Sequence, residues 1–225
     1  MRLYLDIETI PSQSADVHAA IAASIEPPGN ISKPETIAKW HAETKPGLVT
    51  EAIARTALDG SVGHICAIGW AWDDEQVNVQ SIQSVEDERN SFANVCGAWI
   101  SRGPGVFNAV TVIGHNVVNF DIRFLWQRAI ILGVTMPEWF PRDPKPWGSD
   151  TFDTMTAFAG QRGSIGLERL CVALGMPGKG DIDGSKVGGL WAAGEHDKIA
   201  SYCGEDVKRT RAVHRRMLVA YGEAA

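Results

Sequence analysis

The stretch MRLYLDIETIP, residues 1–11, combines an apolar segment with two closely spaced acidic residues. Its mostly apolar and β-branched residues predict a buried first strand over 2–10, followed by a proline. Asp6 and Glu8 are two residues apart in that strand, so their side chains point to the same face. Adjacent carboxylates at the edge of a core repel each other, and uncompensated charge there is costly. The rest of the chain must therefore supply or bind positive charge at this point.

Downstream of this strand, the pattern predicts further strands and an inserted helical segment. Residues 12–60 contain three stretches with helical periodicity and predict a helical insertion after the first strand. Residues 64–72 and 77–82 predict a hairpin, and 109–116 predicts another buried strand.

Helices are predicted between and after these strands. They cover 85–102, 120–133 closed by Gly133, 166–176, 183–194 with Ser185 as N-cap, and about 195–221. This order predicts the α/β class, with a mixed central β-sheet flanked by helices. The length of 225 residues suits a single domain over 1–225 with the insertion at about 12–60.

Composition and charge narrow the class of protein only slightly. Hydrophobic residues make up 44% and charged residues 21%, as in ordinary globular proteins. The formal net charge of −6 disfavours bulk electrostatic capture of nucleic acid. It does not exclude an enzyme that meets phosphates through metal ions, because site carboxylates count as negative until a metal binds.

The four cysteines bear on the redox compartment of the protein, and the uncharged runs bear on whether it spans a membrane. Cys66, Cys96, Cys171 and Cys203 are far apart and form no CxxC pair, so neither a disulfide framework nor a zinc site is expected. A reduced, cytoplasmic setting follows from this. The longest uncharged run, 103–120, contains glycine, proline, asparagine and histidine, so no membrane span is expected.

Three segments carry acidic residues in a pattern that suggests a site. Asp6 and Glu8 end the first strand, and Asp121 in GHNVVNFDIRFL, residues 114–125, follows a strand and begins a helix. Tyr202 and Asp206 in YCGEDV, residues 202–207, are four apart and share one helix face. Each motif alone has an ordinary structural reading: a polar strand edge, a helix N-cap, or a packed aromatic beside a solvated acid. Their ordered combination is far more specific.

On these motifs the chain resembles the DEDD superfamily of 3′–5′ exonucleases, which have a ribonuclease H-like fold. More narrowly, it is similar to stand-alone proteins related to the proofreading exonuclease domain of family B DNA polymerases. Asp6 and Glu8 match the first motif, NVVNFD with Asp121 matches the second, and Tyr202 with Asp206 matches the Tyr-x-x-x-Asp motif of the tyrosine subclass. The segments 166–179 and 181–187 also look like this narrower group, whereas the insertion is less diagnostic.

The resemblance implies a site with two Mg²⁺ (or Mn²⁺) ions, which prefer carboxylate oxygens. Asp6 would bridge both ions, Glu8 and Asp206 would hold the ion that activates water, and Asp121 would serve the second ion, chiefly through water. Tyr202 would orient the attacking water, since a hydroxyl with a pKa near ~10 is a poor base. Such ions would answer the charge at Asp6 and Glu8, and without them the cluster should be strained and partly protonated.

Several neighbours of these motifs are candidate substrate contacts. By resemblance, Thr9 and Ile10 are expected to touch the terminal nucleotide through backbone and side chain. Asn116 is expected to bind substrate phosphate or sugar, and Asn119 to order the turn before Asp121. Phe120 has two readings, stacking on a terminal base or packing in the core.

Other polar and aromatic residues are expected to be structural, or have two readings. His115 is read as structural or substrate-adjacent, and Asp153 as structural. The loop 136–149 interleaves aromatic and basic residues, which suits a single-strand channel or an ordered packed loop equally; these residues are Trp139, Phe140, Arg142, Lys145 and Trp147. A basic cluster near the C-terminus is read mainly as a solvated helix face; it comprises Lys208, Arg209, Arg211, Arg215 and Arg216.

The function expected from the resemblance is metal-dependent 3′–5′ exonucleolytic hydrolysis of single-stranded DNA to nucleoside 5′-monophosphates. The expected partner is single-stranded nucleic acid, with DNA favoured over RNA, and any role in proofreading would need a separate DNA polymerase or replication protein. The alternatives are an exoribonuclease on short RNA, a non-catalytic nucleic-acid-binding or polymerase-accessory module, and an endonuclease or resolvase of the ribonuclease H fold. The last would not require the Tyr-x-x-x-Asp motif.

Overall fold

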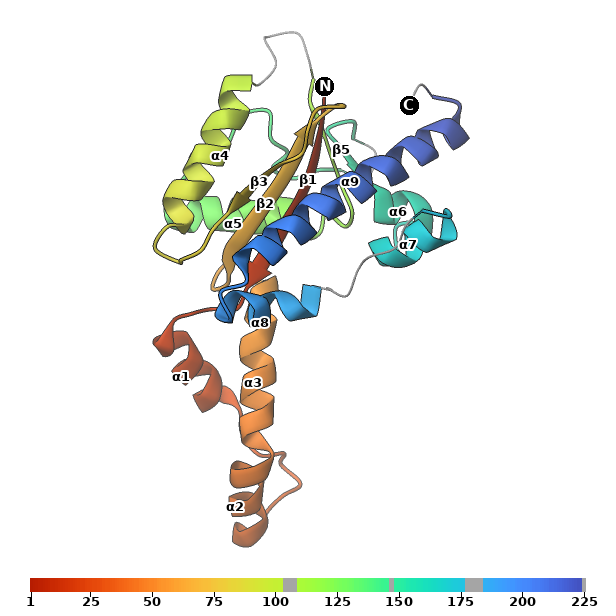
Figure 1. The fold of residues 1–225 in the computed structure, drawn as a ribbon. Helices are drawn as coiled ribbons and strands as arrows, with labels where there is room; N and C mark the ends of the chain where they lie inside the picture. The colour runs from red at the N-terminus through yellow and green to blue at the C-terminus, as the bar shows by residue number, and fades with distance from the viewer. Residues whose placement is uncertain (103–108, 146–147, 177–183, 224–225) are drawn as a thin grey trace.

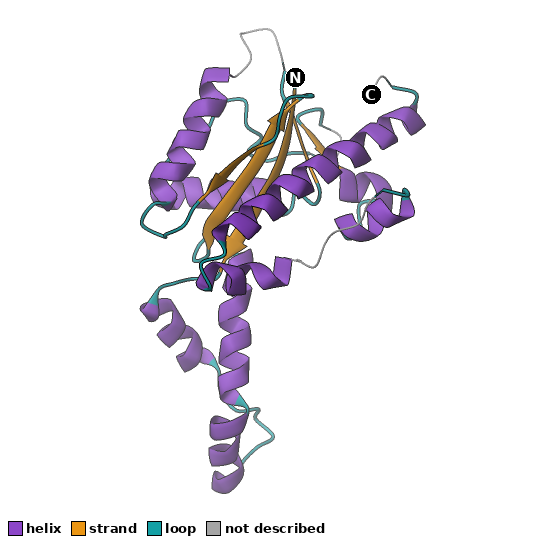
Figure 2. Cartoon of the chain, viewed as in Figure 1, coloured by secondary structure: helices purple, strands orange, loops and turns teal. Residues whose placement is uncertain are grey.

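A mixed sheet of five strands forms the centre of the computed structural model, which describes residues 1–102, 109–145, 148–176 and 184–223 (Figures 1 and 2). The strands are β1 (Arg2–Ile10), β2 (His64–Trp72), β3 (Asn78–Ser81), β4 (Thr111–Gly114) and β5 (Thr151–Asp153). Their order is β3-β2-β1-β4-β5; β1 pairs antiparallel with β2 and parallel with β4. The first strand is therefore the middle of the sheet, which explains why most of its residues are apolar.

The predicted helices are present, with some shifts at their ends. The described helical segments are α1 (Ala15–Ser24), α2 (Pro34–Glu43), α3 (Lys45–Arg55), η1 (Thr56–Leu58), α4 (Glu88–Arg102), α5 (Asp121–Leu132), α6 (Thr154–Ala159), α7 (Leu167–Ala173), η2 (Gly184–Lys186), α8 (Val187–Ala192) and α9 (His196–Tyr221). The predicted N-cap at Ser185 is wrong: Ser185 lies within η2, and Lys186 occupies the N-cap position of α8. Gly133 closes α5 in the left-handed conformation, as predicted.

Helices cover both faces of the sheet, because β1 presents apolar residues on each side. Leu3, Leu5 and Ile7 pack in one cluster with residues of α4 and α5, such as Phe92 and Leu125. On the opposite face, α9 runs diagonally across the strands (Figure 1). The core thus has three layers, with β1 buried in the middle one.

A glycine lets α9 lie very close to the sheet. Gly69 of β2 is the pairing partner of Asp6 in β1. A Cβ atom at Gly69 would lie 2.9 Å from Cys203 Sγ and 3.0 Å from Val207 Cγ2. Any larger residue at this position would push α9 away from the sheet. The close approach brings the middle of α9 next to the acidic part of β1.

The segment between β1 and β2 is a helical insertion, as predicted. Its helices α1, α2 and α3 extend away from the sheet (Figure 1), and Trp40 is their one buried residue. Two hydrogen bonds fasten its end to β1: Thr9 Oγ1 donates to the Ala57 carbonyl at 2.6 Å, and the Ser12 N–H donates to Thr56 Oγ1 at 2.8 Å. The end nearest the sheet is therefore fixed to the strand that carries the acids.

A buried ion pair fixes the segment that leads from the insertion into β2. Glu88, fully buried, accepts hydrogen bonds from Arg128 Nε and Nη2, from His64 Nδ1 and from the Ile65 N–H. Arg128 Nη1 also donates to the Gly60 carbonyl. Burial acts to raise the pKa of Glu88, but these hydrogen bonds outweigh it, and the pKa lies below the usual value. Glu88 is thus ionised and fully paired.

Two aromatic residues of the 136–149 loop, Trp139 and Phe140, pack inward. Phe140 is 2% exposed and stacks on Trp99 with ring centroids 5.6 Å apart, and Trp139 lies edge-on to Trp72. For these residues the structure supports the reading of an ordered packed loop. Trp147, which shared that prediction, lies outside the described residues.

Two further expectations concern cysteines and membranes. The four cysteines, for which no disulfide framework was expected, are free and buried. Within the part of the chain that the structure describes, no helix has both the length and the hydropathy needed to cross a membrane.

Candidate active site

Three of the predicted acidic residues meet where β1 and α9 cross. Asp6, Glu8 and Asp206 each offer a carboxylate oxygen, and these oxygens lie within 4.8 Å of one another. Glu8 is 8% exposed and Asp206 is 5% exposed. Asp6 and Glu8 lie on one face of β1, because side chains two residues apart in a strand point the same way. Asp206 lies beside them because α9 packs so close to the sheet.

Electrostatic repulsion within this cluster is strong. Burial, and then the negative charges of Glu8, Asp121 and Asp206, raise the pKa of Asp6 well above its usual value. The Oδ2 atom of Asp6 is buried and has no hydrogen-bond partner among the described residues. The predicted strain and partial protonation of the metal-free cluster are therefore supported.

A positively charged side chain, Arg209, contacts the acidic cluster. Arg209 Nη1 donates to Asp206 Oδ1 at 2.8 Å, and both side chains are largely buried. Sequence reasoning missed this pair and treated Arg209 as part of a solvated helix face. The spacing of three residues on one helix was the available signal. Lys208 pairs with Glu205 and Arg215 with Asp74, in line with the solvated-face reading.

Asp121 approaches the same region from α5 and is not a helix cap. Phe120 occupies the N-cap position, and Asp121 Oδ1 accepts a hydrogen bond from the Ile7 N–H at 3.0 Å. Burial, and to a lesser degree the charge of Asp153, raise the pKa of Asp121 to about 7. Its carboxyl group thus faces β1 between Asp6 and Glu8, outside the group of three converging oxygens.

Tyr202 lies one helical turn before Asp206 on α9, as predicted. It is 8% exposed and packs with Ile10 and Cys203. Burial raises the pKa of its hydroxyl, and the negative charges of Asp206, Glu8 and Asp6 raise it further. The hydroxyl therefore keeps its proton at neutral pH and is chemically able to donate a hydrogen bond, but it is a poor base.

The turn between β4 and α5 is held by Asp153. Its carboxylate accepts hydrogen bonds from the N–H groups of Asn116 and Val118, and it also caps α6. This supports the expected structural role. Asn116 has a left-handed backbone with φ of 64°, and its Oδ1 accepts a hydrogen bond from Asn119. Both asparagines thus help to order this turn, in line with the role expected of Asn119, and the expected substrate contact of Asn116 stays a prediction.

His115 is also a structural residue at this turn. Its two ring nitrogens lie 3.0 Å from Thr154 Oγ1 and 2.7 Å from the Ile165 carbonyl oxygen. These contacts connect the turn to α6 and to the segment before α7. The structural reading of His115 is therefore favoured over a substrate-adjacent one.

The predicted substrate contacts differ in accessibility. Ile10 is 1% exposed and lies beneath α8 and α9, so its side chain offers no surface to a nucleotide. Thr9 is directed toward the insertion through its bond to Ala57. Phe120 is half-buried, 5.7 Å from the ring of Phe124, and keeps an accessible part. Core packing therefore holds one side of Phe120.

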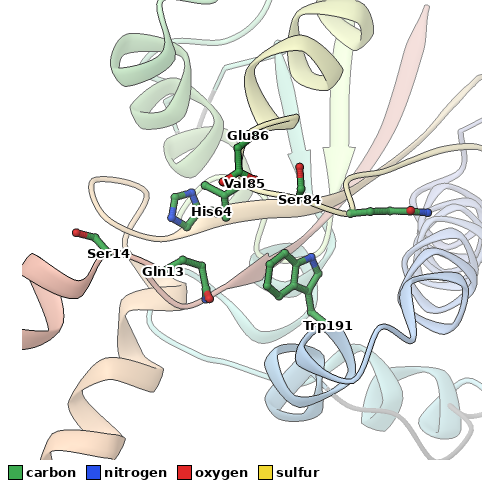
Figure 3. A pocket seen from close by; sticks show the side chains of 8 residues that line it. Gln13, Ser14, His64, Ser84, Val85, Glu86 and Trp191 are labelled. Atoms are coloured by element: carbon green, nitrogen blue, oxygen red, sulfur yellow. The ribbon is translucent and has the colours of Figure 1, made fainter.

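A separate pocket lies at the root of the insertion, as shown in Figure 3. It has a volume of about 410 Å³, and side chains from four segments converge on it: Gln13, His64, Glu86 and Trp191 are examples. None of the predicted site residues lines it. We therefore do not assign it to the acidic site.

The acidic cluster has the donor set of a hard divalent cation. Carboxylate oxygens are the ligands that Mg²⁺ and Mn²⁺ prefer. The Oδ2 atom of Asp6 is buried without a hydrogen-bond donor among the described residues, so it is available as a metal ligand. These residues therefore fit a divalent metal site.

Comparison with known proteins agrees with this arrangement. Residues 58–224 match a family described as predicted 3′–5′ exonucleases related to the exonuclease domain of PolB. Among solved structures, the family B DNA polymerase of the hyperthermophilic archaeon Pyrobaculum calidifontis is similar, with a TM-score of 0.58 and 15% identity. The match covers 98% of this chain and 24% of that chain. No curated protein matches.

The mixed sheet and this likeness confirm the expected ribonuclease H-like fold. The family match begins after β1, so it does not include Asp6 and Glu8. The structure nevertheless puts β1 in the middle of the matched sheet, next to β2 and β4. The strand that bears two of the acids is thus an integral part of this fold.

Proposed function

Because the chain belongs to the family of predicted 3′–5′ exonucleases related to the exonuclease domain of PolB, we propose that it removes nucleotides from the 3′ end of single-stranded DNA. The observation that carries this proposal is the convergence of the Asp6, Glu8 and Asp206 carboxylate oxygens within 4.8 Å. A binding module would gain nothing from such a cluster, because clustered buried carboxylates destabilise a fold that holds no cation.

The proposed reaction is hydrolysis of the last phosphodiester bond. A water oxygen attacks the phosphorus, and the bond from phosphorus to the O3′ atom of the preceding nucleotide breaks. The terminal nucleotide leaves as a nucleoside 5′-monophosphate, and the shortened strand keeps a 3′-hydroxyl. Two Mg²⁺ or Mn²⁺ ions are the proposed cofactors, which supply Lewis-acid stabilisation of the phosphoryl charge and lower the pKa of water.

Each residue of the cluster has a proposed role in this reaction. Asp6, Glu8 and Asp206 would hold the ions, and Asp121 would contribute to the second ion through water. The Ile7 N–H fixes the direction of the Asp121 carboxyl group. The protonated hydroxyl of Tyr202 would hold the attacking water in line, so loss of this hydroxyl should lower kcat more than it changes KM.

Substrate contacts and the wider assembly are also proposals. We assign substrate contacts to Thr9, to the backbone at Ile10, to Asn116 and to the accessible part of Phe120. We further propose that residues 1–225 form one exonuclease domain, which would need a separate polymerase to act in proofreading. The free, buried cysteines suit a reducing, cytoplasmic setting.

A strand-shortening assay tests the function. The protein is incubated with 5′-labelled single-stranded DNA and matching RNA, with Mg²⁺, Mn²⁺ or EDTA. We expect a ladder that shortens from the 3′ end, is absent with EDTA, and forms faster on DNA. Faster shortening of the RNA would instead favour the exoribonuclease.

Matched variants connect this activity to the site. Asp206→Asn should lower the rate by at least about a hundredfold, as expected for loss of a residue that positions a metal ion. Glu205→Gln changes the neighbouring acid on α9, which pairs with Lys208 outside the cluster, and should keep the wild-type rate. If the protein binds both polymers but cleaves neither, the exonuclease proposal fails and a non-catalytic accessory module becomes the favoured function.

A further inference from the structure

A groove runs between the insertion and α8, starting one residue beyond Glu8. Its volume is about 590 Å³, within the range of ligand-binding clefts. One wall is formed by α3 and η1, including Arg55 and Leu58, and the other by η2 and α8, including Gly188 and Gly189. Thr9 and Pro11 lie between these walls.

The insertion wall is firmly attached to β1. The hydrogen bonds from Thr9 to Ala57 and from Ser12 to Thr56 join η1 to the end of the strand. The Arg128 bond to the Gly60 carbonyl fixes the chain just beyond η1. This wall therefore keeps a constant position relative to the acidic cluster, as a substrate-guiding surface must.

The opposite wall allows close approach to its backbone. A Cβ atom at Gly184 or Gly189 would meet no atom within 4 Å, so open space lies above both residues. Glycine at such positions admits a ligand that a side chain would exclude. The surface of this wall is therefore suited to a flat or extended ligand.

The side chains of the insertion wall suit a nucleotide strand. Arg55 is paired with Glu51 on the same helix, and both side chains are more than half exposed. An exposed pair of this kind is weak, so the guanidinium retains donors for a phosphate. Leu58 is 69% exposed and offers apolar area to a base or sugar.

We propose that this groove binds the nucleotides upstream of the scissile phosphate, so that the insertion serves as a substrate-binding wall. Among the described residues that line the groove, none belongs to the acidic cluster, which places the groove beside the reaction centre and not within it. This inference rests on the proposed exonuclease function. It assigns single-stranded nucleic acid as the occupant and gives the insertion a role in affinity for long substrates.

Filling the groove tests the inference. Gly189→Phe places a ring in the open space over α8, and Gly97→Phe is the matched control, because Gly97 is an exposed helical glycine on α4 with open space above it. KM is measured for a thymidine dinucleotide and for a long oligothymidylate. In Gly189→Phe, the ratio of the oligothymidylate KM to the dinucleotide KM should rise about tenfold. The control should keep the wild-type ratio.

A charge variant covers the case in which Gly189→Phe does not fold. Arg55→Gln should raise the same ratio about threefold, as expected for loss of one exposed phosphate contact. Lys39→Gln is its control, because Lys39 forms a similar exposed pair with Glu43 in the insertion but on α2. An unchanged ratio in both groove variants would overturn the inference.

A binding measurement separates this inference from the proposed function. If the wild-type protein cleaves neither substrate, the exonuclease proposal fails, and fluorescence anisotropy with labelled oligothymidylate then tests the groove alone. Weaker binding by Gly189→Phe or Arg55→Gln, but not by the controls, would support the groove. Equal binding by all proteins would overturn it.

Discussion

Asp121→Asn should stabilise the metal-free protein above neutral pH. The Asp121 side chain is 3% exposed, and its pKa is raised from 3.8 to about 7. Asparagine keeps an oxygen that can accept the hydrogen bond from the Ile7 N–H, but it cannot ionise. The substitution therefore removes the burial of a charge while it retains the contact with β1.

The magnitude follows from the difference in proton binding between the folded and unfolded chains. Between pH 4 and pH 7 the folded protein holds the Asp121 proton more tightly than the unfolded chain. The associated stability is complete below pH 4, falls as pH rises, and is lost above pH 7. The difference between a pKa of about 7 in the folded protein and the ordinary value of 3.8 corresponds to about 4 kcal/mol of unfolding free energy. Asp121→Asn should therefore gain up to about 4 kcal/mol near pH 8 and almost nothing near pH 4.

Urea denaturation with EDTA at these two pH values measures the effect. Asp153→Asn is the contrasting control, because Asp153 is also buried but its carboxylate is satisfied by backbone N–H groups. Loss of these charge-assisted hydrogen bonds should cost about 1–3 kcal/mol. Two buried acids on neighbouring elements should thus respond with opposite signs.

Either of two outcomes would refute the reasoning. If Asp121→Asn has the same stability as the wild type near pH 8, or gains equally at both pH values, then ionisation of Asp121 costs the fold nothing. The electrostatic account of the acidic cluster would then be wrong. Addition of Mg²⁺ should remove the advantage of the variant, because the wild-type carboxylate then gains a cation.

Three further predictions concern stability. Mg²⁺ or Mn²⁺ should raise the melting temperature of the wild type, and this rise should be much smaller in Asp6→Asn. Thermal denaturation measures both values, and equal rises in the two proteins would contradict the metal site. Glu88→Gln leaves Arg128 buried without its carboxylate and should cost about 3–5 kcal/mol in urea unfolding, whereas a loss below about 1 kcal/mol would contradict the ion-pair account. His214 is buried, and its pKa is lowered to about 4 by burial and then by the charge of Arg2. As the pH falls, the unfolded chain therefore binds a proton at this histidine before the folded protein does. The free energy of unfolding should fall by about 3 kcal/mol from pH 6.5 to pH 4. The His214→Asn variant should lose that part of the pH dependence, and an unchanged slope would contradict it.

The long elements were predictable from the sequence. The alternation and apolar runs of β1 and β2, and the periodicity of α9, are local signals that reach across nine or more residues. The strand β5 and the helix α6 were not predicted, because three and six residues carry too little periodicity. Their position is set by pairing with β4 and by the cap at Asp153.

The acidic residues were also predictable, but their surroundings were not. Alternation along β1 and the spacing of Tyr202 and Asp206 place side chains on known faces of their elements. The approach of α9 depends on Gly69, which lies far from α9 in the sequence. In the same way, burial of Ile10 depends on residues of α8 and α9, and no local pattern in β1 reveals it.

Identification of the first product tests the central claim most directly. A single-stranded DNA is labelled in the phosphate that joins its last two nucleotides and is incubated with Mg²⁺ and either the wild type or Asp6→Ala. The account predicts that the label appears first as a nucleoside 5′-monophosphate, with the wild type alone. Label that appears first in an oligonucleotide, or equal release by Asp6→Ala, would contradict a 3′–5′ exonuclease centred on Asp6.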